Sequence, residues 1–266
     1  MSCEWPIVRL GDYVDSCLGK MLDKKKNKGN FHPYLGNSNV RWGTFDLNNL
    51  SVMKFKENEH ERYSLKQGDL VICEGGEPGR CAIWENEEEN MKIQKALHRV
   101  RPNSYLDNYY LYYWFLRAGK TGTLDAYFTG TTIKHFTGKV LTELPIELPP
   151  LNVQRKIGKV LRNIDKKISL NTQTNQTLED MAQAIFKSWF VDFDPVKAKM
   201  RGEKPVGMDD ATAALFPDTL VESELGLIPE GWRVQSFFKW IKITKGKNIT
   251  KKTIVEGNIP VVAGGL

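Results

Sequence analysis

The sequence predicts an α+β protein, in which a mixed, strand-rich domain over residues 1–150 precedes a long coiled-coil helix over residues 151–191. Short apolar runs between glycine turns indicate the strands. A heptad repeat without a proline indicates one continuous helix. Proline and glycine then return and predict a linker over residues 192–230. Residues 231–266 follow as a fragment of a second domain.

The clearest strands of the first domain flank a glycine loop. Residues 70–73 and 81–84 are apolar, and residues 75–79 (GGEPG) between them have the composition of a tight loop. We therefore expect two strands within residues 69–84.

A buried helix and an extended segment complete this domain. Residues 109–116 are aromatic and apolar throughout, and Asp107 or Asn108 can cap a helix that contains them. Residues 144–151 contain prolines that exclude a helix, so the chain is expected to be extended there. The long helix follows at once.

The long helix carries one apolar seam along its length. At roughly 55 Å it is too long for a single small domain to wrap, so its seam predicts a partner helix, in this chain or in a second copy. A long helix packed on its own domain is the alternative. Two asparagines in mid-seam would fix register and partner number. The seam residues, in steps of four and three, are Ile157, Leu161, Ile164, Ile168, Asn171, Asn175, Leu178, Ala182, Ile185 and Trp189.

The rest of the chain is expected to contain one short helix at most and then a repeat. The short helix is expected around residues 209–216, within the linker. The repeat has one constant offset, at which Trp5, Gly19, Lys20 and Pro33 match Trp232, Gly246, Lys247 and Pro260.

Composition excludes several classes of protein. An apolar content of 41% is enough for a core, so the chain is not expected to be disordered. The four cysteines lack metal-ligand spacing, which favours free thiols in a reducing compartment. Neither a signal peptide nor a run of 18 apolar residues is present, so we expect a soluble, cytoplasmic protein with no membrane partner.

Catalytic signatures are missing. The sequence has no phosphate-binding loop, no zinc-protease motif and no nucleophile elbow. Residues 148–151 (LPPL) lack the Asn or Asp of the loop that holds an amino group for methylation. Asp192 and Asp194 lie where the helix enters the linker and are expected to be solvated. We therefore expect no catalytic residue and no metal ligand.

Clustered basic residues favour an anionic partner. The net charge is +6, and lysines crowd residues 20–28 and the opening of the long helix. Counterion release favours the binding of such clusters to phosphates. A solvated lysine-rich face is the competing interpretation. Residues 1–150 are nearly neutral overall, which suits a sequence reader. Residues in expected loops that match phosphates or base edges are Lys20, Lys24, Lys25, Lys26, Asn37, Asn39, Arg41, Glu77, Arg80, Lys95, His98, Thr131, Thr132, Lys134 and His135.

Seven segments closely resemble the specificity (S) subunit of type I restriction-modification systems. The LPPL run that enters a long helix with QRKI is the most specific part, and the resemblance covers essentially the whole chain. The segments are residues 5–12 (WPIVRLGD), 68–71 (GDLV), 130–134 (GTTIK), 144–151 (LPIELPPL), 154–157 (QRKI), 188–193 (SWFVDF) and 228–232 (IPEGW).

The resemblance implies a non-catalytic subunit that directs other subunits to DNA. Residues 1–150 would be a target recognition domain that reads one half of a split double-stranded DNA site, and paired antiparallel helices would set the spacing of the halves. Two modification subunits would bind S-adenosylmethionine and methylate adenine, and restriction subunits would translocate and cut DNA. This chain would bind no cofactor.

The resemblance is to half of such a subunit. One recognition domain, one long helix and a fragment at residues 231–266 suggest a half-length form, natural, frame-truncated or engineered, and we expect two copies to pair. Two other functions remain open, namely a nuclease or methyltransferase with an unrecognised site and a coiled-coil scaffold without a nucleic-acid role. Turnover of DNA would indicate the first, and DNA binding no better than that of a neutral control would indicate the second.

Overall fold

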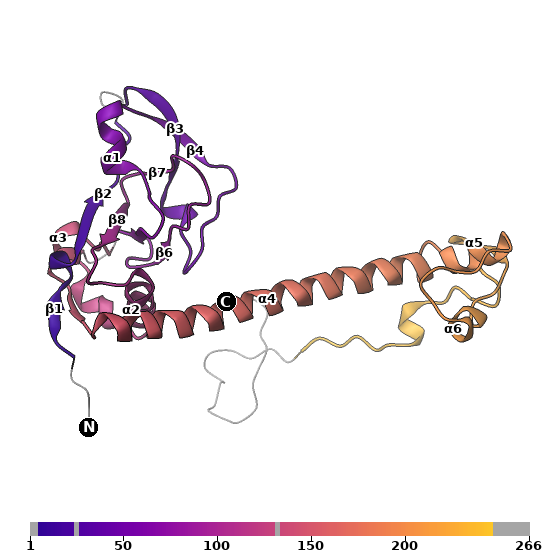
Figure 1. Ribbon diagram of the computed structural model, residues 1–266. Helices are drawn as coiled ribbons and strands as arrows, with labels where there is room; N and C mark the ends of the chain where they lie inside the picture. Colours follow the sequence, from indigo (N-terminus) through magenta and orange to yellow (C-terminus); the bar gives the residue numbers. More distant parts are fainter. Residues whose placement is uncertain (1–4, 24–26, 131–133, 247–266) are drawn as a thin grey trace. The chain divides into compact units, whose positions relative to one another are not determined.

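The computed structural model describes residues 5–23, 27–130 and 134–246 (Figure 1). The chain forms two compact units, Met1–Gln173 and Thr174–Leu266. The long helix α4 (Leu151–Phe190) contributes to both. Strands and helices are both present and the long helix is continuous, which confirms the α+β prediction.

An antiparallel sheet of four strands organises the first unit. Its order is β2 (Val14–Leu18), β8 (Leu97–Pro102), β5 (Leu70–Cys73) and β6 (Cys81–Ile83). The strands β5 and β6 pair through Leu70↔Ile83 and Ile72↔Cys81, so the prediction of two strands around the glycine loop is confirmed. All four residues of β5 are buried.

A second sheet and several short elements surround the first. Its order is β4 (Ser51–Phe55), β3 (Asn30–Leu35) and β7 (Lys92–Ile93), with β3 and β7 parallel. The remaining elements of this unit are β1 (Ile7–Arg9), α1 (His60–Tyr63), α2 (Asn108–Lys120), α3 (Gly138–Glu143), β9 (Pro145–Glu147) and the 3-10 turns Leu10–Asp12, Asn37–Asn39, Glu57–Glu59 and Thr123–Tyr127.

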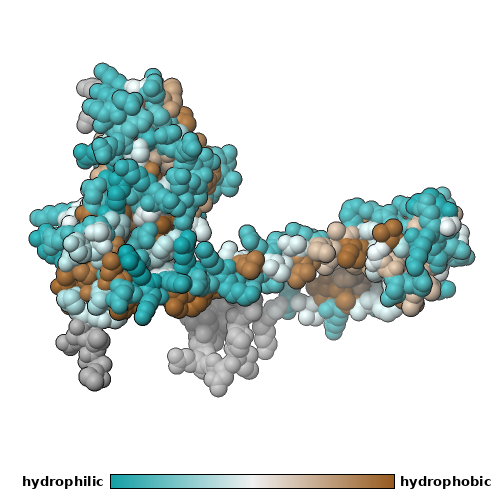
Figure 2. Space-filling view, viewed as in Figure 1, coloured by the Kyte–Doolittle hydropathy of each residue, from teal (hydrophilic) through white to brown (hydrophobic). Residues whose placement is uncertain are grey.

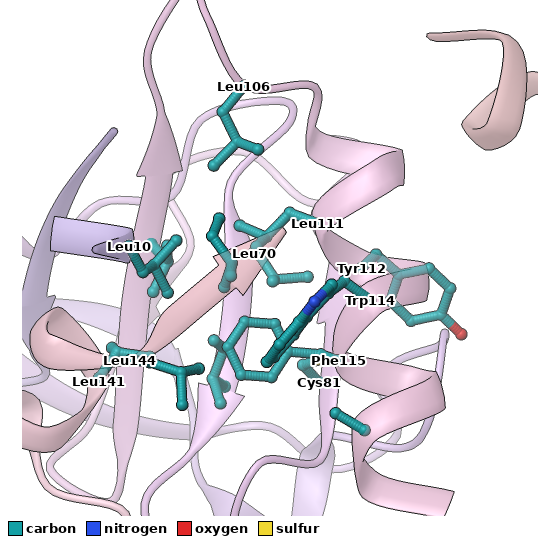
Figure 3. Close-up of a cluster of buried hydrophobic side chains, with 14 of the residues drawn as sticks. Leu10, Leu70, Cys81, Leu106, Leu111, Tyr112, Trp114, Phe115, Leu141 and Leu144 are labelled. Carbon is teal, nitrogen blue, oxygen red and sulfur yellow. The ribbon is translucent and has the colours of Figure 1, made fainter. Parts of the chain in front are cut away.

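The central strand β5 separates two hydrophobic cores. Side chains alternate along a strand, so Leu70 and Ile72 point to one core and Val71 and Cys73 to the other. The first core includes the inner face of α2, where Leu111, Trp114 and Phe115 face the sheet, as Figure 3 shows. The predicted buried helix over residues 109–116 is confirmed.

The sequence places the start of α2 at a capping residue. The Asp107 side chain accepts a hydrogen bond from the Tyr110 amide at 2.9 Å, which satisfies one of the free N–H groups of the first turn. Within the helix, Tyr110, Leu111, Tyr112, Trp114, Phe115 and Ala118 are buried.

The extended segment before α4 is confirmed as well. The strand β9 pairs antiparallel with β1, and the Leu148 amide donates to the Pro6 carbonyl at 2.8 Å. The helix begins at Leu151, directly after Pro149 and Pro150. Proline is tolerated ahead of the first helical turn because it lacks an N–H.

Two residues fix the opening turns of α4 on the domain. The buried Gln154 accepts from the Asp107 amide at 2.8 Å and donates to the carbonyls of Pro149 and Tyr105. A Cβ at Gly158 would lie 2.9 Å from the Tyr109 Cβ, so glycine permits the close approach of α4 to α2.

The second unit contains more structure than the sequence predicts. Its elements are α5 (Asp194–Met200), α6 (Asp210–Ala214), the hairpin β10 (Leu220–Ser223) and β11 (Gly226–Pro229), and the 3-10 turn Phe237–Lys239. The expectation of one short helix at most was wrong, because Pro195 stands in the first turn of α5, where its missing N–H breaks no hydrogen bond. Phe190 stacks on Trp232, with ring centroids 6.3 Å apart.

Three features of the described residues bear on function. Over the residues that the structure describes, no helix is both long and apolar enough to span a bilayer. The same residues contain no group of three or more potential metal-ligating His, Cys, Asp or Glu side chains. Cys17, Cys73 and Cys81 are free thiols, and Cys3 lies outside the described part of the chain.

Candidate nucleic-acid interface

Three loops that are far apart in sequence meet beside the β5–β6 hairpin. We call residues 36–46, 74–80 and 134–137 the loop cluster. The Arg80 Nη2 donates to the Asn37 carbonyl at 3.1 Å, which joins the first two loops. The Phe136 amide donates to the Glu74 carbonyl at 2.7 Å, which joins the second and third. Three segments of the predicted DNA-binding set therefore meet in one surface region.

The backbone conformation of the glycine loop requires glycine at two positions. Gly76 and Gly79 have φ values of +74° and +86°, in the left-handed region that glycine adopts without strain. A Cβ at Gly76 would also lie 2.5 Å from the Asn37 Nδ2, so the neighbouring loop can approach closely only because no side chain is there.

An exposed carboxylate stands at the centre of the loop cluster. Glu77 Oε1 accepts from the Trp42 indole at 2.6 Å, and its Oε2 accepts from the Arg80 Nη1 at 2.9 Å. The Glu77 side chain is 52% exposed and that of Arg80 is 17% exposed. Trp42 was not among the predicted site residues, although an indole between Arg41 and Gly43 in a polar loop is a usable signal.

The other predicted residues of the first loop have different settings. Asn39 is structural, since its side chain accepts from the Gly36 amide and donates to the Asp46 carbonyl, both at 2.9 Å. Arg41 is exposed and pairs with Asp46 at 3.6 Å while also donating to the Ser38 carbonyl. Arg41 is therefore the more accessible of the two.

Two further basic side chains of the predicted set border the loop cluster. Lys134 is exposed, 3.8 Å from Asp125 and 5.6 Å from the centre of the Phe128 ring. His135 is exposed, and its ring lies about 3.5 Å from the place of a Cβ at Gly75. Lys95 is exposed next to Ala96, whose carbonyl accepts from the Glu74 amide.

The structure corrects two of the predicted DNA contacts. Lys20 is 4% exposed, and its ammonium donates to the Lys54 carbonyl and pairs with Glu59 at 2.5 Å. His98 is 1% exposed, with Nε2 2.8 Å from the Phe136 carbonyl, and burial lowers its pKa. Both side chains are enclosed and have a structural role. Lys24, Lys25, Lys26, Thr131 and Thr132 lie outside the described residues.

A group of polar contacts, which we call the clasp, joins the first half of α4 to the rest of the first unit. Arg162 pairs with Glu85 at 3.0 Å and lies 4.2 Å from the centre of the Tyr109 ring. The Tyr113 hydroxyl donates to Asp165 at 2.7 Å, and burial together with this carboxylate raises the pKa of Tyr113. These contacts border a groove of about 840 Å³ and hold this part of α4 against α2 and Glu85.

Beyond the clasp the seam of α4 is uncovered. Ile164, Ile168, Leu178 and Ile185 are 50%, 58%, 57% and 46% exposed. Figure 2 shows brown apolar patches along the helix, whereas teal covers much of the surface over β3 and β4. Of the 40 residues of α4, Gln154 and Gly158 are the buried ones. The apolar side chains of this seam are therefore left largely exposed by the chain's own first unit and helix.

Comparison with known proteins supplies the family. The family model described as type I restriction modification DNA specificity domain matches residues 3–180. The HindI type I restriction enzyme specificity subunit of Haemophilus influenzae is 34% identical over 142 residues, or 51% of this chain and 30% of the relative. The MjaVIII specificity subunit of Methanocaldococcus jannaschii is 23% identical over 262 residues, or 96% of this chain and 53% of the relative.

A solved structure shows the same fold. A chain from a type I R-M system superposes with a TM-score of 0.50 and 20% identity, over 71% of this chain and 46% of that chain. Measured against the two curated relatives, this chain spans 30% and 53% of their length.

Proposed function

Because the chain belongs to the family of type I restriction-modification DNA specificity domains, we propose that it is the DNA-reading subunit of a type I restriction-modification complex. The observation that carries the proposal is the loop cluster, which gathers Arg41, Glu77, Lys134 and His135 on one exposed face. Guanidinium, ammonium and carboxylate groups are those that contact phosphates and base edges.

In this proposal the chemistry belongs to partner subunits. Modification subunits bind S-adenosylmethionine and methylate adenine, restriction subunits cut DNA, and this chain brings both to a sequence. Titration of the chain alone with S-adenosylmethionine should give no binding heat. A clear one-to-one isotherm would favour a methyltransferase with an unrecognised site.

The proposal includes a two-fold dimer through α4. A narrow seam with a period of seven residues is typical of helices that pair with one another. If two copies of α4 lie antiparallel with their centre at residue 173, every seam residue meets a seam residue. The pairs are Ile157 with Trp189, Leu161 with Ile185, Ile164 with Ala182, Ile168 with Leu178 and Asn171 with Asn175. The exposure of the seam supports this arrangement.

A dimer of this kind predicts the form of the DNA site. Two identical readers related by a two-fold axis favour two inverted half-sites around a fixed spacer. Deletion of one heptad from α4 removes about 10 Å of helix, which corresponds to roughly three base pairs at ~3.4 Å each. The spacer should shorten accordingly while the half-sites stay unchanged.

Methylation mapping on a random-sequence library tests the proposal. The complete complex of this chain with its modification subunits should methylate adenines in one palindromic split site. Replacement of Lys134 by Ala should weaken DNA binding and change its salt dependence if this side chain neutralises a phosphate, whereas replacement of the exposed Lys197 in α5 should not. Random methylation by the complete complex would refute the proposal.

A further inference from the structure

The loop cluster contains two residues, Glu77 and Arg80, that are suited to base recognition by their chemistry alone. By residue type, an arginine suits a contact with guanine and a glutamate can accept from the amino group of cytosine. Their hydrogen bonds in the folded chain separate the two roles.

The guanidinium of Arg80 is already committed within the protein. Its Nη1 donates to Glu77 and its Nη2 donates to the Asn37 carbonyl, while its Nε is buried. Recognition of guanine uses two parallel N–H groups of the guanidinium fork. Because this fork is directed at Glu77 and Asn37 and the side chain is 17% exposed, Arg80 holds other groups in place.

The carboxylate of Glu77, in contrast to the guanidinium of Arg80, is accessible to a ligand. Each of its oxygens accepts one hydrogen bond from the protein, and each carboxylate oxygen has two acceptor sites. The side chain is 52% exposed, so acceptor sites remain available to a ligand. An ionised carboxylate only accepts, and the matching donor on a base edge is an exocyclic amino group, most directly the N4 amino group of cytosine.

The position of this carboxylate is fixed from several sides. The Trp42 indole holds Oε1, and a Cβ at Gly119 of α2 would lie 2.7 Å from the same indole ring, so the ring rests on a buried helix. Arg80 holds Oε2 and is itself tied to Asn37. An acceptor that is held before binding loses little conformational freedom when DNA arrives.

We propose that Glu77 is a base-reading residue of the loop cluster, which accepts a hydrogen bond from an exocyclic amino group of the cytosine type, and that Arg80 and Trp42 are positioning residues that act through Glu77. This inference rests on the proposed function. A cytosine–guanine pair is expected at one fixed position of each half-site.

Site selection by the complete complex on a random-sequence library tests the inference. Glu77→Ala should reduce discrimination at that one position by about tenfold or more. Glu77→Gln, which keeps the size of the side chain, should move the preference there toward adenine, because a carboxamide pairs with both the N6 and N7 groups of adenine. The exposed carboxylate of Glu61 on α1 provides the matched control, and Glu61→Gln should change no position.

A double-mutant cycle tests the role of Arg80. If Arg80 acts through Glu77, Arg80→Ala relaxes the same position as Glu77→Ala, the double variant is no worse than Glu77→Ala alone, and Arg80→Lys restores part of the discrimination. Additive effects at two different positions would overturn the inference and make Arg80 a reader in its own right. Thermal melting of each variant verifies the fold.

Failure of the proposed function and failure of this inference would give different results. A wild-type complex that selects no sequence would refute the proposed function together with the inference. A wild-type complex that selects a split site, none of whose positions responds to Glu77→Ala, would refute the inference alone.

Discussion

The helices α2 and α4 carry apolar side chains at comparable spacing but use them in opposite ways. Six of the 13 residues of α2 are buried by the domain itself. Two of the 40 residues of α4 are buried, and neither Gln154 nor Gly158 is a large apolar residue. The apolar groups of α2 therefore stabilise the fold of one chain, whereas those on the seam of α4 are available to a second helix.

The largest effect is expected from a substitution on the buried face of α2. Phe115 is fully buried between α2 and the sheet, and Phe115→Ala should lower the free energy of unfolding by ~3–5 kcal/mol through lost burial and a cavity. Chemical denaturation measures the loss. The exposed Lys120 on the same helix is the control, and Lys120→Ala should change stability by no more than about 0.5 kcal/mol. An equal loss in both variants would mean that the core contact of Phe115 is not the cause.

A substitution on the seam of α4 should affect the assembly of two chains rather than the folding of one. Ile164→Asp puts an unpaired carboxylate into the seam of the proposed dimer, so the dissociation constant should rise about a hundredfold or more. Light scattering of the wild type should give about twice 30.4 kDa. The adjacent Asn163 is exposed and off the seam, so Asn163→Asp should remain dimeric. A wild type that is monomeric at tens of micromolar would refute the dimer.

The sequence predicts the periodic parts of the molecule well. The aromatic run of α2 and the heptads of α4 depend on local spacing, which a single sequence displays. The enclosure of Lys20 and His98 depends on tertiary partners, the Lys54 carbonyl with Glu59 and the Phe136 carbonyl. Such distant partners leave no local pattern, so both residues look like ordinary loop cations in the sequence.

The loop cluster illustrates the same limit. The sequence identifies the glycine loop and the residues of each loop, because turn chemistry is local. Which loops meet, and that Arg80 turns toward Glu77 and Asn37, follows from the pairing of β5 with β6 and from the close approach of Asn37 to Gly76. The chemical types of the candidate site are therefore predictable, and the division of roles among them is not.

A smaller effect is expected where α4 joins the domain. Gln154→Ala removes three hydrogen bonds to the Asp107 amide and to the carbonyls of Tyr105 and Pro149. Buried groups left without partners should cost about 1–3 kcal/mol of stability. Asn152 is exposed one half-turn earlier, so Asn152→Ala should be close to neutral, and denaturation curves of the two variants give the contrast. Equal curves would show that the amide of Gln154 does not anchor the helix.

The smallest expected effect is on the pH dependence of the free energy of unfolding, which a buried histidine should influence and an exposed one should not. Burial lowers the pKa of His98 below its ordinary value of 6.5, and this outweighs the opposing influence of the Phe136 carbonyl and Glu74. Burial and Lys92 lower the pKa of His32 in the same direction. The unfolded chain then binds protons before the folded chain does, so the stabilisation is complete above about pH 6.5 and decreases as the pH falls from there toward the folded-state pKa. His98→Gln should make the free energy of unfolding less dependent on pH between about pH 7.5 and about pH 5, whereas the exposed His135→Gln should leave that dependence unchanged. A wild-type stability that rises on acidification over this interval would contradict the burial argument for both histidines.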